Sequence, residues 1–188
     1  KGLGAPKDYP SLGLLTTDCD DATYLALDEA TKAANVDVVY AKSFYAGAAN
    51  ASTKLAGEVI GILAGPTPGA VRSGMDAALG ALKRLGFEDL GGVPCLAHTV
   101  ASAGSYLAAE AGVRQGSALA YLIAPPLESM YGMDAAMKAA DVKLCKLYAP
   151  PSETNFGGGL LSGTQSACEA ACAAFSQRVA EVAARPAE

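Results

Sequence analysis

Four carboxylates are the side chains of this sequence best suited to chemistry. Asp20 and Asp21 are adjacent, and Glu58 and Glu128 lie in other segments. Paired carboxyl groups can act as general acid and base or hold a divalent cation. They can also surround a small primary ammonium group, whose three N–H donors need acceptors. The plainer alternatives are that Asp20 and Asp21 cap a helix, and that Glu58 and Glu128 are solvated ends of a strand and a helix.

Two lysines recur in the same local pattern. Lys32 and Lys138 each follow an aspartate, Asp28 or Asp134, by four residues. The plain interpretation is a pair on a helix surface that contributes about 0.3 kcal/mol. The same lysine stands at the same place in both halves of the chain, which indicates one shared role.

Several functional classes find no support in the remaining sequence. The only histidine, His98, lies in an apolar run and is predicted to be buried or at an interface. No nucleophile-elbow string is present, and residues 157–159 lack the spacing and the lysine of a phosphate-binding loop. The five cysteines include no C-x-x-C pair, which favours free thiols in a reducing compartment. We therefore predict a protein that is not an enzyme and holds no metal.

Charge and hydropathy argue against two further kinds of partner. The net charge is −5 and no basic block is present, so nucleic acid is not an expected partner. The longest stretch without charge, residues 90–109, is interrupted by glycine and proline, so a membrane span is not expected either.

An internal repeat organises the chain. Residues 28–36 recur as residues 134–142 at an offset of 106, with six of nine positions identical. Residues 63–65 match residues 161–163 at an offset of 98, so the intervening loop is eight residues longer in the first copy. We predict two domains, residues 1–90 and residues 91–188.

Each copy is predicted to run strand, helix, strand, strand, helix. The expected strands are residues 11–17, 36–41 and 59–64 in the first copy, and 118–124, 142–148 and 159–162 in the second. The fold class is α+β, with helices packed on a small, mostly antiparallel sheet. A further strand at 93–100 and a short helix at 104–111 precede the second copy. Their counterparts would lie ahead of Lys1, so we expect the first copy to be incomplete at its N-terminus, with a strand missing.

The repeated residues resemble a known family. The pattern Asp-x-x-x-Lys-Ala-Ala-x-Val, present twice, is similar to that of bacterial microcompartment shell domains. The strings at residues 124–128 (Ala-Pro-Pro-Leu-Glu) and 150–155 (Pro-Pro-Ser-Glu-Thr-Asn) resemble the EutL type, the tandem, circularly permuted shell proteins of ethanolamine-utilization compartments. The resemblance covers nearly the whole chain and is weakest at residues 85–94.

The resemblance implies a structural role in a shell. Two permuted shell domains per chain would give a homotrimer shaped as a flat, pseudohexagonal tile. Such tiles would pack with other shell proteins into a two-dimensional layer, the shell of a cytoplasmic microcompartment. Lys32 and Lys138 would lie at the tile edge.

The resemblance also implies pores for small-molecule transport. A loop-gated central pore would be lined by the strand-connecting loops, through Gly47, Ala48, Asn50, Ser52, Thr53, Ser152, Thr154, Asn155, Phe156 and Gly157. A smaller pore within each subunit would bind a metabolite such as ethanolamine through Asp20, Asp21, Tyr45, Glu58 and Glu128. No cofactor is required, and cobalamin or ethanolamine are the bound ligands left open. From the residues alone, an ordinary surface loop rich in turn formers is the favoured interpretation of the first set.

Two alternative functions remain open from the sequence. One is a soluble regulatory trimer that binds a small molecule without tiling. The other is a shell protein of an ethanol- or propanediol-type compartment.

Overall fold

The computed structural model describes residues 8–43, 59–149 and 156–185. The chain divides into two compact units, Lys1–Gly86 with Gly104–Leu107, and Phe87–Ala103 with Ala108–Glu188. Within the described residues every strand pair is antiparallel, and helices pack on each sheet. The predicted α+β class is confirmed.

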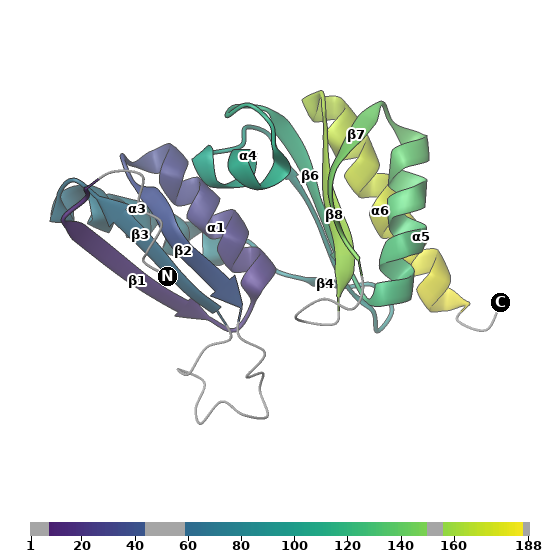
Figure 1. The fold of residues 1–188 in the computed structure, drawn as a ribbon. Helices are drawn as coiled ribbons and strands as arrows, with labels where there is room; N and C mark the ends of the chain where they lie inside the picture. Colours follow the sequence, from purple (N-terminus) through teal and green to yellow (C-terminus); the bar gives the residue numbers. More distant parts are fainter. Residues whose placement is uncertain (1–7, 44–58, 150–155, 186–188) are drawn as a thin grey trace. The chain divides into compact units, whose positions relative to one another are not determined.

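The first unit is a three-stranded sheet with two long helices. It contains β1 (Ser11–Thr17), α1 (Asp20–Ala33), β2 (Asp37–Ser43), β3 (Val59–Gly65) and α3 (Pro68–Leu82), in the strand order β1-β3-β2 (Figure 1). Gly13 and Gly61 lie on the same sheet face, where an added Cβ would press against Val71 of α3 and Leu27 of α1. Glycine in the strands therefore lets both helices approach one face closely.

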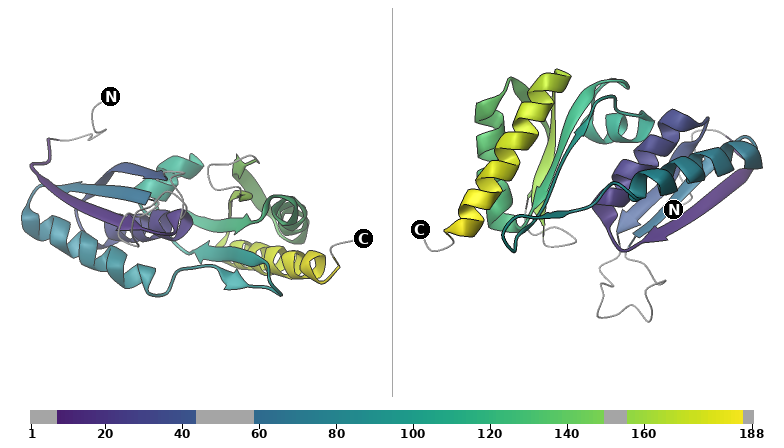
Figure 2. Two further views of the ribbon diagram at one scale, coloured as in Figure 1. Left: turned by 90° about the horizontal axis from the view of Figure 1, so that it is seen from below. Right: turned by 180° about the vertical axis from the view of Figure 1, so that it is seen from behind.

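The second unit has a five-stranded sheet and two long helices. Its elements are β4 (Glu88–Asp89), β5 (Pro94–Val100), β6 (Ala118–Ala124), α5 (Pro126–Ala139), β7 (Val142–Tyr148), β8 (Gly157–Gly163) and α6 (Gln165–Ala184), with strand order β4-β5-β6-β8-β7. Figures 1 and 2 show α5 and α6 side by side along this sheet. Phe175 and Val179 of α6 are buried with alternate residues of β6 in one apolar core. The short helix α4 (Ser105–Ala111) has its start in the first unit and its end in the second.

The two units repeat one another in detail. The β2–β3 ladder shifts register between Val38 and Tyr40, and the β7–β8 ladder shifts between Leu144 and Lys146, 106 residues later. Each bulge bends its strand at the same place. Thr67 and Thr164 cap α3 and α6 in the same way, because each hydroxyl accepts a backbone N–H at 3.2 Å. The repeat seen in the sequence is therefore a repeat of structure.

Three details differ from the sequence-based expectations. Strand β4 was not predicted, and β8 begins at Gly157 rather than at residue 159. Helix α1 begins at Asp20, so Cys19 occupies the N-cap position and neither Asp20 nor Asp21 does. None of the described helices is both long and apolar enough to span a membrane.

Candidate functional site

Two of the predicted pocket acids meet at one end of the first sheet. Thr17, Ser43 and Val59 share this end in the strand register, and α1 begins three residues after Thr17. The Asp21 backbone N–H donates to Asp20 Oδ1 at 2.9 Å, and the Ser43 hydroxyl also hydrogen-bonds the Asp20 carboxylate. The strand ends and the first helical turn therefore gather a carboxylate-rich polar cluster.

Burial makes the charged form of Asp20 costly. Desolvation raises the pKa of Asp20 above its ordinary value of 3.8, although hydrogen bonds from Asp21 and Ser43 act in the opposite direction. Burial and the nearby carboxylates together raise the pKa of the Cys19 thiol to about 11. This thiol stays protonated near neutral pH and is a poor nucleophile. The cluster is suited to receive a cation rather than to attack a substrate.

The other predicted pocket residues are only partly placed. Tyr45 and Glu58 lie outside the described residues. Strand β2 ends at Ser43 and β3 begins at Val59, and these two residues are paired. Glu128 lies in the first turn of α5, in the second unit.

Most of the predicted central-pore residues also fall outside the described residues: Gly47, Ala48, Asn50, Ser52, Thr53, Ser152, Thr154 and Asn155. Phe156 is described, and its ring lies 5.3 Å from that of Phe87. Gly157 was predicted in the pore loop but is a buried residue of β8 that pairs with Ala124.

The conformation of the next residue, Gly158, explains why β8 begins earlier than predicted. Gly158 has φ +143, a conformation that side chains disfavour, and an added Cβ there would collide with the Leu122 backbone. A glycine at this point lets the ladder run two residues further than its apolar pattern suggests.

The repeated lysines both form the expected pairs. Lys138 Nζ lies 2.7 Å from the Asp134 carboxylate, and Lys32 Nζ lies 3.5 Å from that of Asp28 while also pairing with Glu29. The Lys138 side chain is 74% exposed and that of Lys32 is 24% exposed. The Lys138 side chain is therefore more accessible to solvent than that of Lys32.

Asp28 has a second role that sequence reasoning missed. Its carboxylate is 1% exposed and accepts the backbone N–H groups of Gly104 and Leu107, each at 2.8 Å. Thr31 Oγ1 accepts the Ser105 N–H at 3.1 Å. The start of α4 is thus held by α1, which accepts the N–H groups of Gly104, Ser105 and Leu107. The sequence showed an Asp-Lys pair but gave no signal of this burial.

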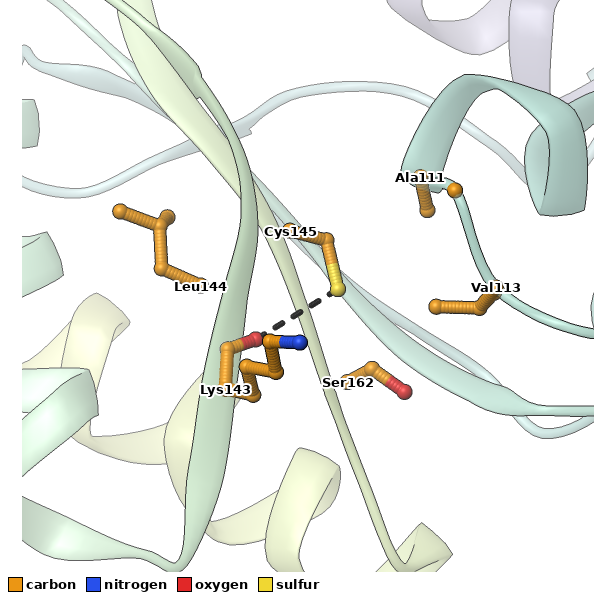
Figure 3. Close-up of a pocket in the computed structure, with 7 residues that line it drawn as sticks. Ala111, Val113, Lys143, Leu144, Cys145 and Ser162 are labelled. Carbon is orange, nitrogen blue, oxygen red and sulfur yellow. Dashed lines mark hydrogen bonds between the residues drawn. The ribbon is translucent and has the colours of Figure 1, made fainter.

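A hollow on the second unit was also not predicted. It has a volume of about 410 Å³ and is lined by Ala111, Gly112, Val113, Lys143, Leu144, Cys145 and Ser162 (Figure 3). Cys145 lies at the bulge of β7, and its thiol donates to the Lys143 carbonyl oxygen at 3.6 Å. Burial raises the pKa of this thiol. With one amine and no carboxylate in its lining, the hollow does not match the predicted ammonium pocket.

A metal centre finds no support in the part of the chain that the structure describes. No group of three or more histidine, cysteine, aspartate or glutamate residues there could hold a metal ion.

The comparison with protein families matches residues 11–103 to the BMC domain. This match runs through the first repeat and on into β5, yet β5 pairs with β6 of the second repeat. A strand that follows one repeat in the sequence but joins the other in the sheet is typical of a permuted arrangement.

Whole-chain relatives decide the family. The chain is 60% identical over 190 residues to the bacterial microcompartment shell protein EutL of Clostridium perfringens (strain 13 / Type A), covering 99% of this chain and 88% of that protein. The chain belongs to the EutL family of bacterial microcompartment shell proteins. The crystal structure of the ethanolamine utilization protein EutL from Leptotrichia buccalis C-1013-b agrees, with a TM-score of 0.93, 58% identity, and coverage of 99% of this chain and 88% of that one.

A more distant structure shares the fold of this EutL-family chain. The trimeric bacterial microcompartment shell protein PduB is 21% identical, with a TM-score of 0.80 over 99% of this chain and 83% of that one. At this identity the likeness shows the fold alone. The 60% identity to the EutL shell protein of Clostridium perfringens, not this fold likeness, confirms the expected shell role and the EutL type.

Proposed function

We propose that this shell protein assembles as a homotrimer whose six repeats form one pseudohexagonal tile, and that tiles pack with other shell proteins into a layer. The supporting observation is the duplicated unit, with the same bulge and the same helix cap in each copy. Repeats that are equivalent in structure can alternate around a ring. The role is structural, together with the passage of small molecules, and it is not catalytic.

The central passage is assigned to the two segments that connect paired strands. Residues 44–58 connect β2 to β3, and residues 149–156 connect β7 to β8, at equivalent places in the two repeats. In a ring of alternating repeats both segments would face the same axis. The first segment is the longer one, and extra loop length costs little closure entropy, so it is the better candidate for a gate.

The acidic cluster at Asp20, Asp21 and Ser43 is assigned to a small ammonium ligand such as ethanolamine. Its support is the raised pKa of the Asp20 carboxyl group, which indicates that this charge is poorly solvated. A bound ammonium group would donate hydrogen bonds to this carboxylate and compensate its negative charge. The name of the relatives, ethanolamine utilization protein, fits this ligand class.

Calorimetric titration of ethanolamine at neutral pH tests the ligand assignment. We expect binding to the unsubstituted chain, loss of binding in Asp20→Asn, and unchanged binding in Glu29→Gln, which alters an exposed carboxylate of the same helix. Ethylene glycol, which keeps the hydroxyl and lacks the amine, should not bind. Equal binding of ethanolamine to the Asp20→Asn variant would remove the assignment.

Electron microscopy of the concentrated protein tests the tile itself. A shell tile is expected to form flat layers of repeating discs. A soluble regulatory trimer, the alternative function, would give only separate particles.

A further inference from the structure

The hollow on the second unit is bounded by two strands and by the end of a helix. Lys143 and Ser162 are paired residues of β7 and β8, so their side chains leave the sheet on the same side. Ala111 and Val113, at and just after the end of α4, lie across the hollow from Lys143 (Figure 3). The Leu144 side chain turns the other way, as expected for the next residue of a strand. All of these residues belong to the second unit.

The hollow contains one ammonium group that is not neutralised by a carboxylate. Lys146 pairs with Glu110, whereas Lys143 forms no ion pair within the part of the chain that the structure describes. Figure 3 shows the Lys143 amine directed towards Cys145 and Ser162. Burial raises the pKa of the Cys145 thiol and the charge of Lys143 acts against this rise, which is consistent with an ammonium group close to the sulfur. The hollow is therefore suited to attract an anion.

The other polar groups of the lining already donate their hydrogens elsewhere. The Ser162 hydroxyl donates to a carbonyl oxygen of β6 at 3.1 Å, and the Cys145 thiol donates to one within β7 at 3.6 Å. The backbone N–H groups of Gly112 and Val113 donate to carbonyl oxygens of α4 at 3.3 and 2.9 Å. A ligand in the hollow therefore meets the three N–H donors of Lys143 and a hydroxyl oxygen that is left to accept.

These groups define the chemistry of a matching ligand. A single ammonium group without available backbone N–H donors suits the single charge of a carboxylate, whereas phosphate is usually held by several donors. The Ser162 oxygen accepts, so the ligand should carry an O–H donor. The Ala111 and Val113 side chains are suited to a short aliphatic part. The volume of about 410 Å³ lies at the small end of the range for ligand pockets.

We propose that this hollow binds a small aliphatic hydroxycarboxylate. The carboxylate pairs with Lys143, the hydroxyl group donates to Ser162, and the aliphatic carbons contact Val113. The site differs from the acidic cluster of the first unit, because its charge is positive and its ligand is an anion. It gives the shell protein a second class of small-molecule ligand, and it does not depend on the proposed ring.

Saturation-transfer NMR of the full-length chain, with lactate as the probe, tests the proposal. Because Lys143 is exposed and its ion pair is screened by water, we expect half-saturation in the millimolar range. The Lys143→Gln variant should raise the half-saturating concentration about tenfold, because it removes the only charge that faces the carboxylate. Lys83→Gln, which removes an exposed lysine of the first unit, is the matched control and should bind lactate normally.

Two ligand analogues and two further variants test the remaining contacts. Propionate lacks the hydroxyl group and should bind about fivefold more weakly than lactate to the parent, but equally to Ser162→Ala. Ethylene glycol lacks the carboxylate and should not bind. The Val113→Phe variant fills the hollow without changing its charge and should also weaken lactate binding. Circular dichroism checks that each variant keeps its fold.

Each result either supports or overturns the proposal. Lactate binding that is weakened in Lys143→Gln and Val113→Phe but kept in Lys83→Gln supports it. Equal binding to the parent and Lys143→Gln, or no binding to the parent, overturns it. Inorganic phosphate that displaces lactate at a lower concentration than lactate itself requires would also overturn it, because the hollow would then be an unselective anion site. None of these results changes the expected trimer mass, so the proposed function is tested separately.

Discussion

At the scale of single residues, burial decides what each carboxylate does. Asp28 and Glu29 are neighbours on α1 and both lie near Lys32, yet Asp28 is buried and bonded to two backbone N–H groups, while Glu29 stays half-exposed. Asp20 is partly buried beside Asp21, and this burial raises its pKa because the charged carboxylate is poorly solvated. Identical functional groups thus act as a structural cap, a surface ion and a candidate ligand site.

Replacing Asp28 should destabilise the fold strongly. The Asp28→Ala variant leaves two backbone donors without their charged acceptor, so we expect the free energy of unfolding to fall by about 3 kcal/mol. Urea unfolding followed by circular dichroism, at one protein concentration, measures this change. Glu29→Ala is the control and should change the value by less than about 0.5 kcal/mol. An equal effect of both substitutions would contradict the capping role.

The raised pKa of Asp20 predicts a pH dependence with a definite sign. The folded state holds this proton more tightly than the unfolded state, whose pKa is near 3.8. The corresponding stability is present below pH 3.8 and is lost as the pH rises through the folded-state pKa. Relative to Asp20→Asn, which stays neutral, the unsubstituted chain should therefore lose stability as the pH rises from about 4 towards 7. Urea unfolding of both proteins across this range tests it, and a constant difference would contradict it.

At the scale of elements, the space around a glycine decides whether a larger residue stabilises or destabilises the fold. Gly158 lies in β8 with φ +143, and an added Cβ would lie 2.8 Å from the Leu122 carbonyl carbon. The Gly158→Ala substitution should lower the free energy of unfolding by about 3 kcal/mol through strain and overpacking. Gly80 in α3 has open space around it, so Gly80→Ala should instead raise stability by about 0.5–1 kcal/mol. Thermal unfolding of the two variants should shift in opposite directions.

Much of the element pattern could be predicted because its signals are local. Helical spacing, the Thr67 cap and the repeated motif lie within short stretches, and the structure places α1 and α5 106 residues apart as expected. The two-residue strand β4 has too few residues to show a period. Gly157 was misplaced because three successive glycines read as a loop, whereas backbone pairing with β6 makes them a strand.

At the scale of the whole molecule, contacts between residues far apart in the chain limit what the sequence can predict. The site residues could be predicted only in part, because Asp20 and Asp21 share one helical turn but the burial of Asp28 depends on residues 76 and 79 positions away. No pattern within a short stretch of sequence indicates a contact between residues so far apart. The similarity to the EutL family supplied the shell role that the residues alone left open.

The repeated lysines should control layers and not trimers. The Lys32→Gln and Lys138→Gln double variant keeps most of each stem and removes the charge that would reach neighbouring carbonyl groups. We expect it to remain trimeric while flat layers disappear in electron micrographs. Lys83→Gln with Lys143→Gln, one exposed lysine from each repeat, is the control and should form normal layers. Normal layers from the first pair would contradict the edge role.

The most direct test of the tandem-repeat tile is the solution mass of the full-length protein, measured by light scattering. The account predicts a particle of three chains, three times the 18.8 kDa of this sequence plus any further residues of the natural chain. That mass should hold as the protein is diluted into the micromolar range. A stable monomer, or a closed dimer, would contradict the ring of alternating repeats.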